Sequence, residues 1–566
     1  MIPQKLKKYL QWISLSSLGL TCLVASPFVT FDAFNPPKLL VLSTCAGIAL
    51  GLIILSAKSS ELRKYKSVLM VAGIFFVSLL VSSIAAKQAF VTTFYGISGR
   101  NTGMLAYLSL LIIFVSASIA SDKTFLDKLK KLILIVGVMS QIYAWYQILG
   151  FDPAPWSQES WIKSFFANPN FLSAFLGITA AFSNAIIFSA ESAVKIRIYA
   201  AAYSIFTLFT MIKVGNTQGF IVFGIGLLLI SYLFIRTRFK SGKIHLTYLF
   251  VSSLLPVWAI LDMLQKTPGE SYLWKLSVSS RGDFWRAAWN MALERPILGW
   301  GLDAYRDYFE KFRDVRQATR GEGALLGEIA HNVFLDLLVG GGFLLLVSYV
   351  LIIVVSFFSV IRVIKRTSTY DVGFVATAAG LVGYLAQSTI SANHLGLAIC
   401  GWIFLGSLIG YEINTREESI NVILSNKNDG PRIKKQVEKK APKGIVSAVV
   451  LGTILGFSTA LPLFLVNTKQ MAATNNRNAG EMFNAALAFP RDSVRMCMFA
   501  ERLRDGGFEM DAITLAREAA ELSPHSVLPL KVLTTFPSIP QTEKDELWRK
   551  IRIMDPYYDL VPRPTS

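Results

Sequence analysis

The feature of this chain that most constrains its fold is a succession of apolar runs, each long enough to cross a lipid bilayer as a helix. Hydrophobic residues make up 53% of the chain and charged residues 16%, below the roughly 25% typical of soluble domains. A transmembrane helix needs about 20 apolar residues. We place thirteen such runs at roughly 10–30, 39–56, 67–86, 102–120, 132–149, 171–190, 198–213, 219–235, 245–263, 332–360, 372–390, 395–411 and 444–466. The chain is therefore predicted to be an all-α, polytopic membrane protein.

Lysine and arginine fall in alternate connections between these runs, which predicts the orientation. One set of connections carries basic clusters, at 5–8, 63–66, 128–131, 236–243 and 362–366. The short connections of the other set carry isolated basic residues, chiefly Lys38, Lys87, Arg100 and Lys163. Because Lys and Arg accumulate in cytoplasmic loops, we expect a cytoplasmic N-terminus and an extracytoplasmic C-terminal tail. The same clusters, lying against lipid headgroups, account for the net charge of +19 without a nucleic-acid partner.

The runs and the loops between them divide the chain into four parts. Residues 1–411 form a polytopic domain whose largest outward loop is 264–331. Residues 412–443, rich in Lys, Asn and Glu, are predicted to be a basic cytoplasmic linker. Residues 444–466 form the last transmembrane helix, and 467–566, which lack a further span, form a small helical extracytoplasmic domain.

The C-terminal part shows an internal repeat. Pro490, Pro524 and Pro556 each follow an apolar helical stretch, at spacings of 34 and 32 residues. A period of about 34 residues with a proline after the second helix is typical of tetratricopeptide repeats. The alternative is an ordinary small helical bundle. Either interpretation predicts a helical interaction module with a possible protein partner.

The large loop carries two motifs that flank its polar part. The first is SRGDFWRAAWNMALERPILGWG at 280–301, and the second is HNVFLDLLVGGG at 331–342. Ser280 is a plausible N-cap, with Asp283 completing a weak capping box. The resulting helix is predicted to place Arg281, Trp285, Ala288 and Trp289 on one face at the membrane surface. Pro296 and the glycines Gly299 and Gly301 end it, and these glycines and Trp285 are interpreted as structural.

Two arginines near the start of this helix are candidate anion ligands. The planar guanidinium of arginine makes bidentate hydrogen bonds to phosphate, which suits Arg281 and Arg286 to a lipid-linked diphosphate. The alternative is that they pair with Asp283, Asp314 or lipid headgroups.

His331, where the loop enters the next span, is the candidate general base. A near-neutral imidazole can take a proton from an acceptor hydroxyl, and Asn332 follows it directly. A lone histidine at a span boundary is more often an interfacial residue, and His394, in a short loop on the same side, is a competing candidate.

Other outward loops add polar groups. Arg100 lies beside glycines in YGISGRNTG, and Asn168 and Asn170 flank Pro169 at the start of a span. Arg100 is otherwise explained as a headgroup anchor, and the asparagines as helix initiators. The spacing of Cys, His and acidic residues predicts no metal site, and no glycine-rich nucleotide loop follows a strand. We expect neither metal nor cofactor.

Together these residues resemble the O-antigen ligase and polymerase superfamily. The resemblance rests on SRxxxWxxAxxM…PxxGxG from Ser280 to Gly301, then HNxxL and its glycines, about 63 residues in all, with support from the GR element at Arg100 and the NPN element at Asn170. Members are polytopic bacterial membrane glycosyltransferases, and tetratricopeptide-like tails occur among them.

The resemblance implies a metal-independent transfer in the bacterial cytoplasmic membrane. A glycan would pass from a polyprenyl-diphosphate carrier to a hydroxyl acceptor on a glycolipid such as lipid A-core, on a growing glycan or on a protein. His331 would be the general base, and Arg281 and Arg100 would hold the diphosphate. The choice among ligase, polymerase and protein glycosylation stays open.

The sequence departs from the family pattern at two positions. Many relatives carry Ser-Arg-Gly where this chain has Thr217-Gln218-Gly219, so Gln218 would donate neutral hydrogen bonds instead of an arginine's. Many also carry a glutamate nine residues after the motif histidine, where Gly340 stands here.

Two functions of other classes compete with the transferase. A transporter or flippase of lipid-linked glycans would favour charged residues within spans and duplicated halves, and the predicted spans are nearly free of charge. A membrane-tethered scaffold would depend on residues 467–566 and tolerate substitutions in the large loop.

Overall fold

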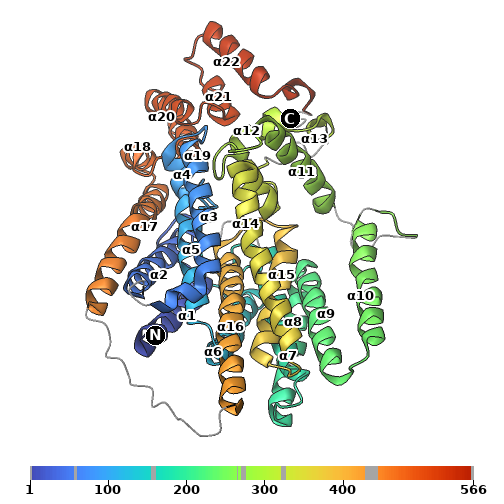
Figure 1. The fold of residues 1–566 in the computed structure, drawn as a ribbon. Helices are drawn as coiled ribbons and strands as arrows, with labels where there is room; N and C mark the ends of the chain where they lie inside the picture. Colours follow the sequence, from blue (N-terminus) through green and yellow to red (C-terminus); the bar gives the residue numbers. More distant parts are fainter. Residues whose placement is uncertain are drawn as a thin grey trace.

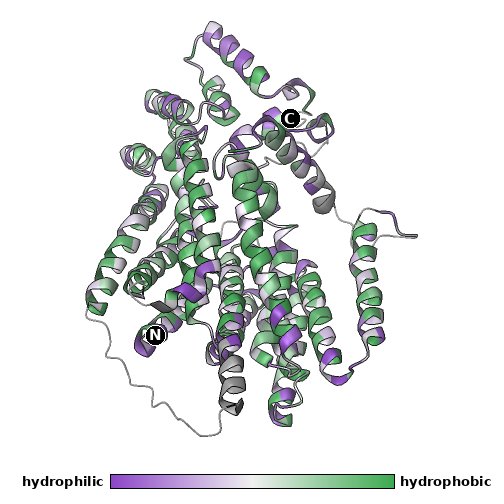
Figure 2. Cartoon of the chain, viewed as in Figure 1, coloured by the Kyte–Doolittle hydropathy of each residue, from purple (hydrophilic) through white to green (hydrophobic). Residues whose placement is uncertain are grey.

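The computed structural model describes residues 3–56, 60–154, 161–263, 265–268, 276–319, 327–427 and 444–561. Within these ranges every regular element is a helix. The long helices form a bundle, with the large-loop helices and the C-terminal helices together at one end (Figure 1). Hydrophobic residues follow the length of the bundle, whereas the last C-terminal helix is largely hydrophilic (Figure 2).

Each of the thirteen predicted spans corresponds to a helix of the bundle. These helices are α1 (Gln4–Leu23), α2 (Asn35–Ser56), α3 (Lys66–Ile84), α5 (Met104–Ala120), α6 (Lys123–Ile148), α7 (Pro169–Ile187), α8 (Val194–Val214), α9 (Gln218–Arg238), α10 (Gly242–Met263), α14 (Val333–Arg366), α15 (Val372–Ser388), α16 (Leu395–Lys427) and α17 (Ile445–Asn476). In the described part of the chain nine of them are long and apolar enough to cross a membrane, and α5 and α15 are apolar but shorter. The polytopic helical class is confirmed, and the number of spans stays a prediction.

Two helices run beyond their predicted ends. Helix α16 continues to Lys427 and so includes the first sixteen residues of the segment 412–443 that was predicted to be a linker. The assignment of 412–443 as a linker stays a prediction, and residues 428–443 lie outside the described part. Helix α17 continues to Asn476, ten residues past the predicted end at 466, and so extends from the bundle to within two residues of α18, the first C-terminal helix.

Small residues allow helices distant in the sequence to pack closely. A Cβ on Gly452 would lie 2.7 Å from the carbonyl carbon of Gly47, which joins α17 to α2. In the same interface the Ser43 hydroxyl donates to the Gly456 carbonyl at 2.8 Å. Close approach through glycine and serine is typical of helices in membranes, where packing takes the place of a hydrophobic driving force.

Lys38 does not lie in an outward connection as predicted. It is in the first turn of α2, is completely buried, and its ammonium donates to the carbonyls of Thr21, Cys22 and Val24 at 2.7, 3.0 and 3.0 Å. These are the unsatisfied carbonyls at the end of α1, where a cation is favoured. Lys38 of α2 therefore caps the C-terminal end of α1.

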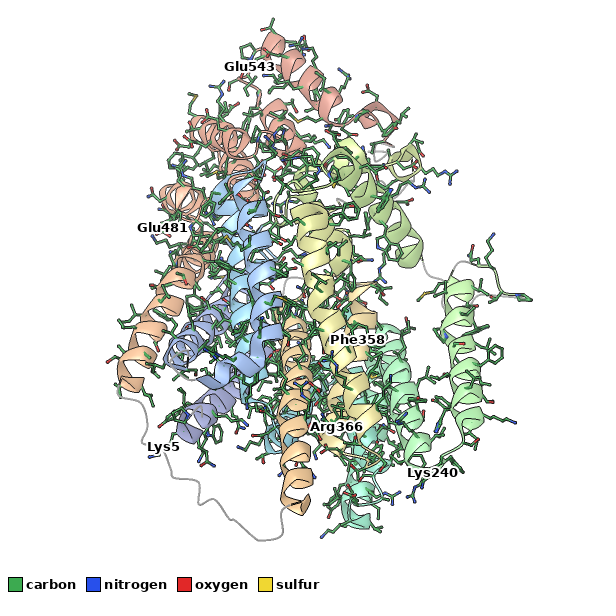
Figure 3. The ribbon with its side chains drawn as sticks, in the orientation of Figure 1. Lys5, Lys240, Phe358, Arg366, Glu481 and Glu543 are labelled. Carbon is green, nitrogen blue, oxygen red and sulfur yellow. The ribbon has the colours of Figure 1, made fainter. Side chains whose placement is uncertain are left out.

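The basic clusters lie at the end of the bundle away from the C-terminal helices. Lys5, Lys240 and Arg366 are at the lower end in Figure 3, whereas Glu481 and Glu543 are at the upper end with the large-loop helices. The charge asymmetry in the sequence thus corresponds to two ends of one bundle. Which end faces the cytoplasm stays a prediction.

A break in α14 joins the two motifs of the large loop. Gly342 has φ 64° and ψ −167°, so the helix is interrupted there. The freed backbone groups bond to the PILGWG segment: the Trp300 and Gly301 amides donate to the carbonyls of Val339 and Gly340 at 2.8 and 2.9 Å. In return, the Phe343 amide donates to the Pro296 carbonyl at 2.6 Å. The glycines of the two motifs form one structural unit, which supports their interpretation as structural.

Gly342→Ala is expected to destabilise the protein. The backbone conformation alone costs a residue with a side chain about 1–3 kcal/mol, and a Cβ would also overlap the Ile297 carbonyl. Thermal unfolding of the detergent-solubilised protein measures the loss. Gly73→Ala in α3 is the control, because a Cβ there meets nothing within 4 Å. Equal melting temperatures for the two variants would contradict the role given to Gly342.

The C-terminal part is helical, as predicted. Its elements are α18 (Ala479–Leu487), α19 (Ser493–Asp505), α20 (Glu509–Leu522), α21 (Val527–Thr534), α22 (Gln541–Met554) and η2 (Tyr558–Leu560). Pro490, Pro524 and Pro556 follow α18, α20 and α22, so each proline closes one unit of the repeat. The assignment of these units as tetratricopeptide repeats stays a prediction.

These helices rest on α12 (Tyr305–Phe312) and α13 (Val315–Thr319) of the large loop. The Arg313 guanidinium holds both carboxylate oxygens of Asp555, at 2.8 and 2.6 Å, and both side chains are buried. Tyr308 stacks on His525 with ring centroids 4.9 Å apart. A buried bidentate pair and a ring stack therefore anchor the C-terminal helices to the loop.

Asp555→Ala is expected to loosen this contact. Removing one partner of a buried ion pair leaves an uncompensated charge and costs about 3–5 kcal/mol. Hydrogen exchange of α22 and α12 should rise, and limited proteolysis should release the C-terminal helices. Asp559→Ala is the control, because its pair with Arg552 is exposed and such pairs contribute about 0–1 kcal/mol. Unchanged exchange in Asp555→Ala would show that the pair does not anchor the domain.

Candidate functional site

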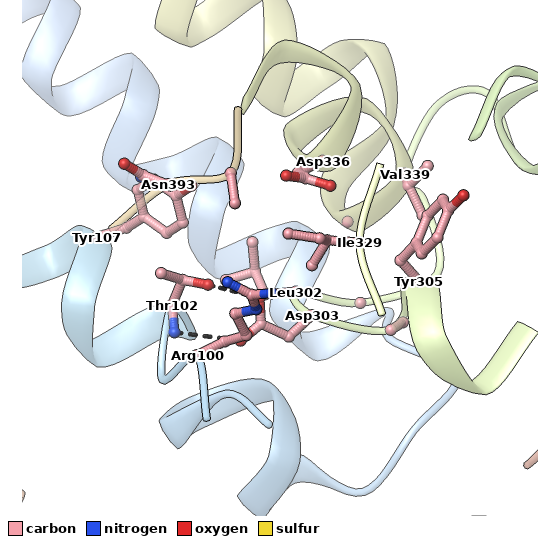
Figure 4. Close-up of a pocket in the computed structure, with 14 residues that line it drawn as sticks. Arg100, Thr102, Tyr107, Leu302, Asp303, Tyr305, Ile329, Asp336, Val339 and Asn393 are labelled. Atoms are coloured by element: carbon pink, nitrogen blue, oxygen red, sulfur yellow. Dashed lines mark hydrogen bonds between the residues drawn. The ribbon is translucent and has the colours of Figure 1, made fainter. Parts of the chain in front are cut away.

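Polar side chains from four distant segments meet at the end of the bundle that carries the large loop. Arg100, Asp303 and Asp336 line one cavity there, together with Tyr305 and Asn393 (Figure 4). Its volume is about 20 Å³, which is room for about one water molecule. These residues come from the loop after α4 (Phe90–Tyr95), the stretch that leads into the start of α12, the first turns of α14 and the connection between α15 and α16.

The loop that carries Arg100 is shaped by the Asp303 carboxylate. Gly96, Gly99 and Asn101 all have positive φ, at 78°, 83° and 54°. Asp303 accepts from the Ile97 and Thr102 amides at 3.2 and 3.1 Å, and from the Thr102 hydroxyl at 2.7 Å. The Thr102 bonds are visible in Figure 4. Burial raises the pKa of Asp303, while these hydrogen bonds and the charge of Arg100 lower it.

Arg100 points from this loop toward the cavity. One terminal nitrogen lies 3.2 Å from a carboxylate oxygen of Glu328, in a half-exposed pair. Its Nε is buried and makes no hydrogen bond within the described part of the chain. The guanidinium therefore keeps part of its donor capacity for another acceptor.

His331 is held on both sides by its neighbours. The Ala330 amide donates to Asp336 at 2.9 Å. Asn332 caps α14 by accepting from the Phe334 and Leu335 amides at 2.9 and 3.1 Å. Between these two anchors His331 takes φ 52°, in the left-handed region. Asn332 is thus the N-cap residue of α14.

The surroundings of the His331 ring are aromatic and cationic. The ring stacks on Phe284 with centroids 5.6 Å apart. Burial, together with the positive charges of Arg100 and Arg281, lowers the pKa of His331 to about 3. The imidazole is therefore neutral near pH 7, and both arginines are close enough to act on it electrostatically.

The helix that carries Arg281 differs from the predicted one. Helix α11 (Leu276–Glu294) begins four residues before Ser280, so the prediction that Ser280 is its N-cap is wrong. Ala288 is completely buried while Trp289 is 48% exposed, so these residues do not share one membrane-facing side as predicted. The buried side packs on α14 and α12, because the large loop forms a small core of its own around Phe284.

The two arginines of α11 have different environments. Arg281 is half-buried, and burial lowers the pKa of its guanidinium. No hydrogen bond or ion pair to Arg281 is found among the described residues. Arg286 is exposed and pairs with Asp314, which was one of the alternatives for it. Trp285, one turn after Arg281, is half-buried, with an indole nitrogen that has no partner in the described ranges.

Gln218 and Asn170 lie in a separate group at the ends of α7 and α9. The Gln218 amide donates to Gln387 at 3.2 Å and is buried. Asn170 accepts from Asn216, and Asn168 caps α7 by accepting from the Asn170 amide at 2.8 Å. Neither Gln218 nor Asn170 is among the residues that line the cavity at Arg100. Their placement favours a helix-end role for Asn168 and Asn170.

His394, the competing histidine, is less accessible than His331. It is 3% exposed, its Nδ1 accepts from the Gly396 amide at 3.2 Å, and its ring stacks on Phe171 at 4.9 Å. Burial, with the charges of Lys38 and Arg100, moves its pKa well below the ordinary value. An acceptor hydroxyl could reach His394 only through the interior.

Two carboxylates that line the cavity were not among the site residues predicted from the sequence. Asp336 lies five residues after His331 in HNVFLD, and Asp303 two residues after Gly301. Asp336 lies inside the second motif and Asp303 directly beyond the first, so membership of a motif or proximity to one was the available signal. Neither forms a metal cluster, and in the described ranges no three His, Cys, Asp or Glu side chains are placed to hold a metal ion.

The fold and this arrangement define a multi-pass helical membrane protein in which His331 lies close to Arg281 of the large loop and to Arg100 of the loop after α4. Residues 202–350 match the family model described as O-antigen ligase. That span begins in α8, ends in α14 and contains both motifs. The segment that holds both motifs is therefore similar to O-antigen ligases, and the predicted resemblance to that superfamily of membrane glycan ligases and polymerases is confirmed. No curated protein matches the chain.

Proposed function

We propose that the protein transfers a glycan from a polyprenyl-diphosphate carrier to a hydroxyl acceptor at the outer face of the bacterial cytoplasmic membrane. One observation supports this most: Arg100, Arg281 and His331 come from three separate segments, and both arginines act on the same imidazole. Two cations beside a neutral base suit a reaction with an anionic leaving group and a hydroxyl nucleophile.

In the proposed reaction the acceptor oxygen attacks the anomeric carbon of the donor sugar. The new carbon–oxygen bond forms as the bond to the diphosphate breaks, with inversion at that carbon. His331 takes the hydroxyl proton. The leaving diphosphate keeps the bonding electrons, and Arg281 and Arg100 stabilise its charge through bidentate hydrogen bonds.

Donor binding would also change the strength of the base. An imidazole whose conjugate acid has a pKa of about 3 is a weak proton acceptor. A bound diphosphate offsets the charges of Arg100 and Arg281, which removes part of the cause of that low pKa. His331 is then a stronger base when the donor is present than when the site is empty.

Asp336 is a candidate replacement for the glutamate that many relatives carry at the position of Gly340. The two residues are one helical turn apart on α14, and both line the cavity. A Cβ at Gly340 would lie 3.3 Å from Leu302 Cα, so a larger side chain fits poorly. Asp336 meanwhile bonds the amide that precedes His331, and we assign it a positioning role.

The pH profiles of kcat/KM and of kcat are expected to differ. With a free-enzyme pKa of about 3 for His331, kcat/KM should be flat between about pH 5 and 8, because the base is already unprotonated there. The acidic limb of kcat should lie at higher pH, since bound diphosphate raises that pKa, and activity is lost as the pH falls through it. Initial rates in proteoliposomes give both profiles. If the acidic limbs of kcat and kcat/KM fell at the same pH, the proposed rise in the pKa of His331 on donor binding would be contradicted.

The proposal is tested with purified protein in proteoliposomes supplied with a polyprenyl-diphosphate oligosaccharide. Mass spectrometry should detect transfer to an added acceptor and release of the carrier diphosphate. Movement of the intact lipid-linked donor across the bilayer without bond cleavage would favour a flippase. In cells, a deletion that accumulates single repeat units indicates a polymerase, and one that accumulates long lipid-linked chains indicates a ligase.

A further inference from the structure

A second and larger cavity lies between the large loop and the C-terminal helices. Its volume is about 370 Å³, within the range of small-molecule sites. It shares no lining residue with the cavity at Arg100. Lys87 after α3, Arg295 and Lys311 from the loop, and His525 from the C-terminal part all contribute to its wall.

The wall of this cavity has an excess of positive charge. Lys87, Arg295 and Lys311 face one carboxylate, Glu294, which lies 3.0 Å from Lys311. Arg295 Nη1 is buried and has no partner among the described residues. The guanidinium of Arg295 and the ammonium of Lys311 lie 5.4 and 5.6 Å from the centre of the Trp300 ring. Cation–π contacts of this kind hold the charges in place before a ligand binds.

The cavity lies at the boundary between the apolar surface of the bundle and the outer loop. Lys87 is three residues after the end of α3, and its amide donates to the Trp300 carbonyl at 2.8 Å. Ile84, three residues before Lys87, and Ile297, two residues after Arg295, are 74% and 68% exposed. The Ile297 carbonyl accepts from the Leu344 amide of α14 at 3.3 Å, and Leu344 is itself 38% exposed. Apolar side chains therefore border the cationic wall on its membrane side.

We propose that this cavity binds the phosphate of an anionic membrane lipid, with Lys87, Arg295 and Lys311 as its ligands. Charge-assisted hydrogen bonds from Arg and Lys are suited to phosphate, and Ile84 and Ile297 would lie against the acyl chains. A soluble anion would use the cations but not the apolar border. The phosphate belongs either to a phospholipid or to a polyprenyl carrier. Because His525 completes the wall, the lipid would bind where the C-terminal helices meet the loop.

The test compares ligands that separate charge from apolar contact. The full-length protein in detergent is titrated with dioctanoyl phosphatidylglycerol, dioctanoyl phosphatidylcholine, a short-chain polyprenyl phosphate and inorganic phosphate. Binding is followed by native mass spectrometry and by the shift in melting temperature. The variant is Lys87→Gln/Lys311→Gln, which removes two exposed charges. The control is Lys544→Gln/Lys550→Gln on α22, where the same charges are removed outside the cavity.

An anionic lipid should bind the wild-type and control proteins, and bind the Lys87→Gln/Lys311→Gln protein roughly tenfold to thirtyfold more weakly. Whichever of phosphatidylglycerol and polyprenyl phosphate shows this loss identifies the source of the phosphate. Equal binding by variant and control, or binding of inorganic phosphate as tight as that of both lipids, would overturn the proposal. Because binding is measured directly, the result does not depend on the proposed transferase activity.

Discussion

His331→Asn is expected to lower the rate of glycan transfer by about 10²–10⁴-fold, which is the usual contribution of a general base. Asparagine keeps a polar side chain of similar size but cannot accept the proton. The backbone anchors on both sides, Asp336 to the Ala330 amide and the Asn332 cap, involve neither imidazole nitrogen, so the fold should persist. Initial rates with saturating donor, at matched protein levels and melting temperatures, measure the effect.

His245→Asn is the control for this experiment. His245 lies in α10, which begins at the other end of the bundle, so its replacement should leave transfer unchanged. His394→Asn tests the competing histidine. If His394→Asn abolished transfer at a normal melting temperature while His331→Asn did not, the role of base would pass to His394.

Arg281→Lys is expected to lower kcat/KM by about 10- to 100-fold, which corresponds to one charge-assisted hydrogen bond of about 1.5–3 kcal/mol. Lysine keeps the charge but loses the planar pair of donors that matches a phosphate. Arg281→Gln also removes a charge that lowers the pKa of His331. The acidic limb of kcat/KM should therefore move to higher pH in Arg281→Gln but not in Arg281→Lys.

Arg286→Lys and Arg286→Gln are the matched controls. Arg286 lies on the same helix five residues away, but it is exposed and already paired with Asp314. Its replacement should change kcat/KM by less than about threefold, in keeping with the small energies of exposed ion pairs. Equal losses at the two positions would mean that α11 contributes through its general charge instead of a specific guanidinium.

The predictions from sequence succeeded where the signal was local. Apolar runs have a fixed minimum length in a bilayer, so the helices were found, including the three between 169 and 238. Helix boundaries were less accurate: α11 begins before Ser280, and α16 extends into the predicted linker. A boundary depends on tertiary contacts as well as on caps.

By itself the sequence determined the helical membrane class, the two motifs of the large loop and the histidine and arginines worth testing. Only the tertiary structure decided which of them meet. Asp303 shapes the loop of Arg100 across about two hundred residues of sequence, and the break at Gly342 joins PILGWG to α14. The tertiary structure also gave Arg281 and Arg286 different environments, and it placed Gln218 away from the cavity at Arg100. These outcomes depend on hydrogen bonds and burial between distant segments, which the periodicity of a single segment does not contain.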